Sequence, residues 1–248
     1  MILVCRFCIK QKAVYALFLG ALFCIIMNAC STCLITEKHS IKKIKETEPY
    51  AAVSIQYPDF PRYPVLSQAI ENAVLPQYTE FAQSAQDKWN EWNALSHEGT
   101  VLSSQKTVPP FEYTVQCKPV YCGDSFISVL ITSYSYSGGA HGTTTIRSFY
   151  YDTVNNCFKT AAEVTGMSEA TIAALCRKVL HQKLQYGNRD ADSEKERTRW
   201  IANGTEPDEG NFSVFTYDGK KATTYFPHYS VAPYSEGILQ VEISPVWE

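Results

Sequence analysis

A regular stripe of apolar residues between Val65 and Leu95 restricts the possible folds of this chain more than any other feature of its sequence. Its members stand three or four positions apart, which is the spacing of one face of an α-helix. They are Leu66, Ile70, Val74, Tyr78, Phe81, Ala85, Trp89 and Trp92. A long helix with one apolar face needs another layer to cover that face, so the stripe predicts a sheet packed against it. We expect Pro76 to kink the helix or to divide it in two.

The rest of the chain is divided into strand-like and helical segments. Ala51–Tyr57 precedes the long helix as a first strand, and an Asp218-Gly219 turn predicts a hairpin near the carboxyl end. The later strands are predicted at Phe111–Val120, Ser125–Ser137, Thr144–Asp152, Phe212–Tyr217, Ala222–Phe226 and Ile238–Ile243, the last of which closes the sheet. Two shorter helices are predicted at Ser168–Gln185, with Ser168 as N-cap and Gly187 as stop, and at Ser193–Asn203. Because helices and strands are segregated along the chain, the predicted class is α+β, an antiparallel sheet packed against one long N-terminal helix and shorter C-terminal helices.

The amino terminus has the pattern of an export signal. Three cations within the first twelve residues precede an apolar run, Ala13–Met27, that is too short for a membrane span of about 20 residues. The run ends at Met27-Asn28-Ala29-Cys30, which resembles a bacterial lipobox. We therefore predict a lipoprotein signal peptide over residues 1–29, lipidation (a palmitate-type anchor) at Cys30 and a polar tether over residues 30–49. Cys33 is an alternative lipidation site, and an uncleaved anchor helix is an alternative to cleavage. In each case the body of the protein is extracytoplasmic, in the cell envelope.

The chain has nine cysteines, and in an extracytoplasmic protein cysteines can form disulfides. Cys117 and Cys122 flank a four-residue segment that could close across a tight turn, so a disulfide between them is possible. Cys176 falls on the apolar face of a predicted helix, which indicates a buried thiol. No cysteine spacing fits a structural zinc site, and we predict neither a metal nor a cofactor.

Composition and charge exclude two classes of protein. Hydrophobic residues make up 45% of the chain and charged residues 19%, so it can bury a core and is not disordered. The first 29 residues hold three of the 22 bases and none of the 25 acids, which leaves a net charge of −6 on the remainder. Nucleic-acid affinity depends on phosphate contacts with basic side chains, so no nucleic-acid partner is expected.

Two motifs carry a resemblance to a known family. The first is Ser133-Tyr-Ser-Tyr-Ser-Gly-Gly-Ala-His-Gly142, and the second is a closing block with Tyr217-Asp218-Gly219, Tyr225-Phe-Pro-His-Tyr229, Val231-Ala-Pro-Tyr234 and Gly237. Residues 50–248 resemble the bacterial extracytoplasmic DUF4163/DUF3298 type, with a DUF4163-like part at 50–110 and a DUF3298-like part at 111–248. Such modules occur in the extracellular part of lysozyme-sensing anti-sigma factors and beside peptidoglycan deacetylases. The resemblance implies a non-catalytic binding or sensing module, and we expect the module alone on a lipid anchor.

The same motifs supply the candidate site. Glycines at 138, 139 and 142 indicate a tight turn or a close ligand approach, and His141 beside them could fix the turn, contact a ligand or act as a base. The candidate ligand-binding residues are Tyr134, Tyr136, Gly138, Gly139, His141, Tyr229 and Tyr234. The expected partners are the membrane, through the lipid, and peptidoglycan fragments or a basic lysozyme-like protein. One alternative is an envelope hydrolase acting on cell-wall glycan or peptide with His141 as base, and another is a structural lipoprotein without a ligand.

Overall fold

The computed structural model describes residues 38–97, 110–138, 140–184 and 191–246, which all belong to one compact unit, Leu34–Glu248. The predicted signal peptide, Cys30 and Gly139 lie outside the described residues. Within the described ranges, no helix has both the length and the apolar character needed to cross a membrane.

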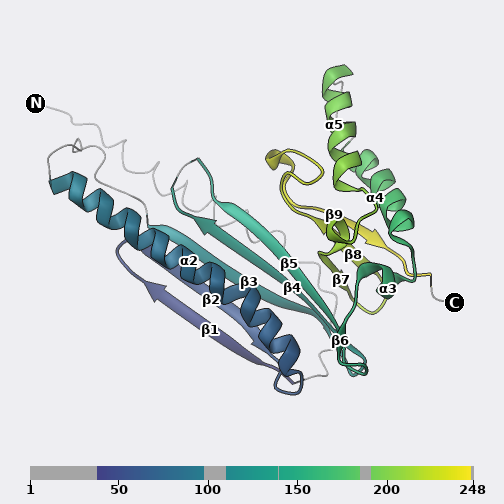
Figure 1. The fold of residues 1–248 in the computed structure, drawn as a ribbon, viewed down its shortest axis with the longest axis horizontal. Helices are drawn as coiled ribbons and strands as arrows, with labels where there is room; N and C mark the ends of the chain where they lie inside the picture. Colours follow the sequence, from purple (N-terminus) through teal and green to yellow (C-terminus); the bar gives the residue numbers. More distant parts are fainter. Residues whose placement is uncertain (1–37, 98–109, 139, 185–190, 247–248) are drawn as a thin grey trace, which may run out of the picture. The chain divides into compact units, whose positions relative to one another are not determined.

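A six-stranded sheet occupies the amino-terminal part of this unit (Figure 1). The sheet order is β1-β2-β3-β4-β5-β6, and the short helix α3 (Ala161–Thr165) follows it. The strands are β1 (Ser40–Thr47), β2 (Ala51–Asp59), β3 (Phe111–Cys122), β4 (Phe126–Tyr136), β5 (Thr143–Asp152) and β6 (Cys157–Phe158). All neighbours are antiparallel except β2 and β3, which are parallel because the long helix α2 (Pro64–His97) connects them as a crossover.

Helix α2 covers one face of this sheet, as its apolar stripe predicted (Figure 1). Leu66, Ile70 and Val74 are completely buried and share a core with Ile55 and Val115 of the sheet. Pro76 does not divide the helix in two, because α2 runs through it as one helix. Pro76 is exposed, so water can satisfy the backbone carbonyl that loses its helical partner.

The segment predicted as a polar tether contains a strand. Residues 40–47 form β1, which pairs along its whole length with β2. Seven of its eight residues are exposed, with Lys42, Lys43 and Lys45 among them. Charged side chains on an edge strand discourage further pairing, which explains why a strand here has the composition of a linker.

The carboxyl-terminal part builds a second, three-stranded sheet with its own core. Its order is β7 (Phe215–Tyr217), β8 (Ala222–Phe226) and β9 (Leu239–Ile243), all antiparallel. The helices here are α4 (Glu169–Lys183), α5 (Ala191–Gly204) and the 3-10 turns η3 (Glu209–Phe212) and η4 (Tyr234–Glu236). Ser168 caps α4 as predicted, since its hydroxyl accepts the Thr171 amide hydrogen at 3.2 Å. The α+β class is confirmed, but the last strand joins this second sheet instead of closing the first.

Two serines explain why the second sheet is separate. Among the described residues, no strand lies beside the outer edge of β7, yet its amide groups have partners on the face of the larger sheet. The Ser128 hydroxyl accepts from the Tyr217 amide at 3.0 Å, and the Ser148 hydroxyl accepts from the Phe215 amide at 2.8 Å. The amide groups at the edge of the smaller sheet are thus satisfied by side chains on the face of the larger sheet.

We predict that Ser128→Ala lowers the free energy of unfolding by about 2 kcal/mol, because it leaves the Tyr217 amide without an acceptor. Urea denaturation followed by circular dichroism measures this. Ser54→Ala on β2, where the serine is half-buried, is the matched control and should change stability by less than about 0.5 kcal/mol. Equal stability of the two variants would contradict this account of the edge.

Candidate functional site

The turn between β4 and β5 is shaped by a close contact between a tyrosine and a glycine. The last strand pairs are Tyr134 with Thr144 and Ser135 with Thr143, after which the chain turns through Gly138, whose φ is +95°. A Cβ atom on Gly142 would lie 2.4 Å from the Tyr134 ring. Any other residue at this position would require the ring to move, so the motif allows Tyr134 to lie directly against the turn.

The closing block contains a strained tyrosine. Tyr229 has a φ of +66°, a left-handed conformation that is rare for a bulky residue. Its side chain is nevertheless 57% exposed, so burial does not explain the strain. Strained residues with exposed side chains occur often at binding sites, which makes Tyr229 a functional candidate on structural grounds as well.

The turn and the closing block meet in a stack of three rings. The His141 ring stacks on Tyr234 with centroids 4.1 Å apart, and the His228 ring stacks on Tyr234 at 4.2 Å. Two imidazoles at these distances cannot share one face of a phenol ring, so they occupy opposite faces. We call His141, Tyr234 and His228 the ring stack. The Tyr234 hydroxyl donates to the Gly142 carbonyl at 2.9 Å and anchors the stack to the turn.

Hydrogen bonding assigns the state of the His141 ring. Its Nδ1 atom lies 3.0 Å from the Gly142 carbonyl, which can only accept, so Nδ1 carries the hydrogen. In the neutral ring Nε2 is then the acceptor atom available to a ligand. The opposite ring, His228, has a buried Nδ1 atom that finds no hydrogen-bond partner within the described ranges.

Trp200 of α5 extends the ring stack into a larger surface. Its ring centroid lies 6.4 Å from that of Tyr229, which in turn lies 5.8 Å from Tyr234. We call the ring stack together with Tyr229 and Trp200 the aromatic face. The Trp200 indole donates to the Glu196 carboxylate at 2.9 Å, which holds the ring in place.

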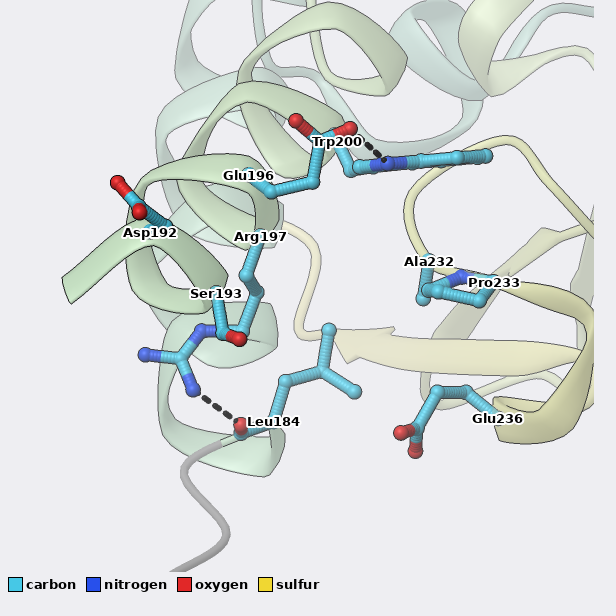
Figure 2. A pocket seen from close by; sticks show the side chains of 9 residues that line it. All are labelled: Leu184, Asp192, Ser193, Glu196, Arg197, Trp200, Ala232, Pro233 and Glu236. Carbon is cyan, nitrogen blue, oxygen red and sulfur yellow. Dashed lines mark hydrogen bonds between the residues drawn. The ribbon is translucent and has the colours of Figure 1, made fainter. Parts of the chain in front are cut away.

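Trp200 forms a wall of the pocket in Figure 2, whose volume is about 440 Å³. The pocket lies between α5 and the closing block, and Asp192, Glu196 and Glu236 are among the residues that line it. Arg197 also lines it, but its guanidinium donates to the Leu184 carbonyl at 2.6 Å and pairs with Glu194. A smaller hollow of about 360 Å³, lined by Tyr229 and Ser230, also adjoins Trp200.

Most of the predicted site residues therefore come together. Tyr134, His141, Tyr229 and Tyr234 gather at the turn or on the aromatic face, and Gly138 begins the turn. Tyr136 ends β4 and, by strand alternation, shares a sheet face with Tyr134. His228 and Trp200 were not among the predicted site residues. The Phe-Pro-His-Tyr motif pointed to the former, whereas a single tryptophan in a charged helix gave no signal for the latter.

The possible disulfide does not form. Cys117 and Cys122 both remain thiols and lie on the same strand, β3. Five strand residues span about 16 Å, well beyond the 7 Å limit between the Cα atoms of a disulfide. The tight turn inferred between them is a strand with a bulge between Pro119 and Tyr121. In the described ranges, no three metal-ligating side chains gather into a metal site.

Comparisons with known proteins agree with this arrangement. Residues 44–144 match the family model described as Deacetylase PdaC, and residues 164–244 match the model of the protein family of unknown function DUF3298. The chain thus contains a DUF3298 domain preceded by a PdaC deacetylase-associated domain. His141 lies in the first of these matches and His228 and Tyr234 in the second, so the ring stack joins the two.

Individual relatives are distant. Peptidoglycan-N-acetylmuramic acid deacetylase PdaC of Bacillus subtilis (strain 168) is 24% identical over 170 residues, which are 68% of this chain and 33% of that protein. The chain therefore spans about a third of this relative's length. A DUF3298 family member from Bacteroides fragilis has a TM-score of 0.59 at 16% identity, covering 85% of this chain and 92% of the other. A DUF3298 family protein from Pseudomonas aeruginosa PAO1 has a TM-score of 0.51 at 17% identity, covering 84% and 91%. These two structures share the fold.

The buried thiol on α4 generates a prediction about reactivity. Burial raises the pKa of Cys176 to about 12, so at pH 8 only about one thiol in ten thousand is the reactive thiolate. Iodoacetamide at pH 8 should therefore leave Cys176 unmodified in the folded protein and alkylate the half-exposed Cys157. Mass spectrometry of tryptic peptides measures both, and denatured protein, in which both thiols react, is the control. Rapid alkylation of Cys176 in folded protein would show that α4 is not packed as described.

Proposed function

We propose that this chain is a non-catalytic module of the cell envelope that binds peptidoglycan fragments through its aromatic face. The observation that carries the proposal is the convergence of two distant motifs, the Gly-His turn and the closing block, in a ring stack beside exposed Tyr229. The relative in which the corresponding domains occur is a peptidoglycan deacetylase, which supports a cell-wall ligand.

The chemistry of the aromatic face suits a wall glycan. Sugar rings present apolar C–H faces that pack on aromatic rings, while their hydroxyls need polar partners at the edges. Trp200 and Tyr229 offer ring surface, and Ser193 and Glu196 offer polar groups at the border of the adjoining pocket. The amino groups of a peptide stem would find the carboxylates of Glu236 and Asp192. We further propose that lipid on Cys30 holds the module at the membrane on its extracytoplasmic side.

We predict that Trp200→Ala weakens binding of soluble muropeptides at least tenfold, because hot-spot aromatic residues supply about 2 kcal/mol or more each. Isothermal titration of the full chain with purified muropeptides measures the dissociation constant. The matched control is Trp89→Ala, which removes a half-buried tryptophan from α2. Equal affinity of Trp200→Ala and the unaltered chain, or no saturable binding by the latter, would contradict the proposal.

The same samples test the hydrolase alternative. The His141 ring stacks on Tyr234 and its Nδ1 atom donates to the Gly142 carbonyl, contacts that favour a structural role for this ring. Release of new reducing ends or free amines from peptidoglycan, abolished by His141→Ala in a folded protein, would support catalysis over binding.

A second candidate function is the capture of a basic lysozyme-like protein. Three acidic residues, Asp192, Glu196 and Glu236, line the pocket beside Trp200, with Glu196 paired to Arg199 at 2.7 Å. The net charge of −6 beyond residue 29 would also attract a basic partner over a distance.

If that partner binds, we expect its association rate to fall at least tenfold between 20 and 300 mM salt, because salt screens charge attraction over about 10 Å at 0.1 M. Surface plasmon resonance with a basic lysozyme measures the rate. Glu196→Gln should reduce the salt dependence, and Glu80→Gln, which removes one carboxylate from α2, is the charge-matched control. A rate independent of salt would exclude electrostatic capture.

A further inference from the structure

A groove lined by hydroxyl groups lies between α2 and the strands β4 and β5. Its volume is about 340 Å³, and we call it the hydroxyl groove. It is lined by Gln77, Glu80, Phe81 and Ser84 from α2, Tyr113 from β3, Ser133, Ser135 and Ser137 from β4 and beyond it, and Thr143 and Thr145 from β5.

The hydroxyls form a regular array. Ser133 is the cross-strand partner of Thr145, and Ser135 is the partner of Thr143. Alternation along a strand places all four on the face that α2 covers. Along β4 the preceding positions of this face are Ile127, Val129 and Ile131, all in the core. The face therefore changes from aliphatic to hydroxyl-bearing beneath the second half of α2, although continued apolar residues would bury more apolar surface.

A buried phenol group at the base of the groove has no well-aligned hydrogen-bond partner among the described residues. It belongs to Tyr113, which is 3% exposed. The Ser133 hydroxyl lies close to the phenol and, like the Arg147 guanidinium, lowers its pKa, but burial raises that pKa by more. Leaving a buried hydroxyl unpaired destabilises the fold by about 1–3 kcal/mol, and a ligand that supplies a hydrogen-bond partner would recover part of that free energy.

We propose that the hydroxyl groove is a binding site for a neutral, polyhydroxylated ligand, a pyranose sugar. Serine and threonine hydroxyls both donate and accept, which matches the mixed donor and acceptor pattern of a sugar better than that of an ion. A sugar hydroxyl engaging Ser133 would orient that side chain toward the Tyr113 phenol and complete the chain of hydrogen bonds. Glu80 and Gln77 on α2 provide further acceptors and donors at the groove.

This site is independent of the aromatic face. Tyr134, which packs against the Gly142 turn, stands between Ser133 and Ser135 on β4 and therefore points to the opposite face of the sheet. Sugar binding in the hydroxyl groove thus does not depend on ligand binding at the aromatic face, and each can be disproved without the other.

The test uses the full chain carrying Trp200→Ala, so that the aromatic face contributes little. It is titrated in separate arms with the trimer of N-acetylglucosamine and with the trimer of glucose, by calorimetry. We expect saturable binding in at least one arm. The N-acetylglucosamine arm alone would indicate a wall sugar, and equal binding in both would indicate general sugar recognition.

Tyr113→Phe removes only the unpaired hydroxyl and should weaken that binding about fivefold, while thermal stability stays unchanged or rises. Thr145→Val removes a hydroxyl from the other wall of the groove while keeping the shape of this exposed side chain, and it should also weaken sugar binding severalfold. The matched control is Tyr57→Phe, a buried tyrosine of β2 that faces α2 outside the groove, which should leave the affinity unchanged.

Absence of saturable sugar binding in both arms would overturn the proposal. So would affinities of Tyr113→Phe and Thr145→Val equal to that of Tyr57→Phe. Loss of muropeptide binding in Trp200→Ala with retained, Tyr113-dependent trimer binding would show that both sites exist.

Discussion

Two serine hydroxyls on the face of one sheet satisfy the free edge of another, and the arrangement of the carboxyl-terminal domain depends on them. Backbone amides at a sheet edge need acceptors when they are taken out of water. Ser128 and Ser148 supply these acceptors to Tyr217 and Phe215, so β7 is fixed in position and direction on the larger sheet. Aromatic packing strengthens the junction, since Phe126 stacks on Tyr150 with centroids 5.0 Å apart and contacts Tyr217.

The ring stack is a second junction between the same two parts of the chain. Tyr234 stands between His141 and His228 and reaches the Gly142 carbonyl with its hydroxyl. Gly142 thus contacts two tyrosines. Its carbonyl accepts the hydrogen bond from Tyr234, and the Tyr134 ring occupies the space that a Cβ atom would take. The residues proposed as a ligand site therefore also connect the turn after β4 to the closing block, and the proposed binding at Tyr229 and Trp200 would take place next to this junction.

The larger sheet uses its two faces differently. One face receives α2 and is apolar over most of its length, until the hydroxyls of β4 and β5 replace the aliphatic side chains. The other face receives β7 and, at the Gly-His turn, Tyr234. Because neighbouring residues of a strand point to opposite faces, the single segment Ser133–Tyr136 contributes hydroxyls to one side and phenols to the other. The alternation of serine and tyrosine in the motif thus places the serines on the face that α2 covers and the tyrosines on the opposite face.

The sequence by itself determined the features that depend on local periodicity and turn chemistry. The apolar stripe of α2, the Ser168 cap, the burial of Cys176 and the Asp218-Gly219 hairpin all appear as predicted, because each depends on residues a few positions apart. Local rules misjudged β1 and the Cys117–Cys122 pair, where strand pairing prevailed, and α2 continues through Pro76 as one helix. Only the tertiary structure decided that there are two sheets, that Tyr234 lies between two histidines and that Trp200 packs beside Tyr229. The hydrogen bonds from Tyr217 to Ser128 and from Tyr234 to Gly142 connect residues about 90 positions apart, and such partners come together only once each sheet has formed.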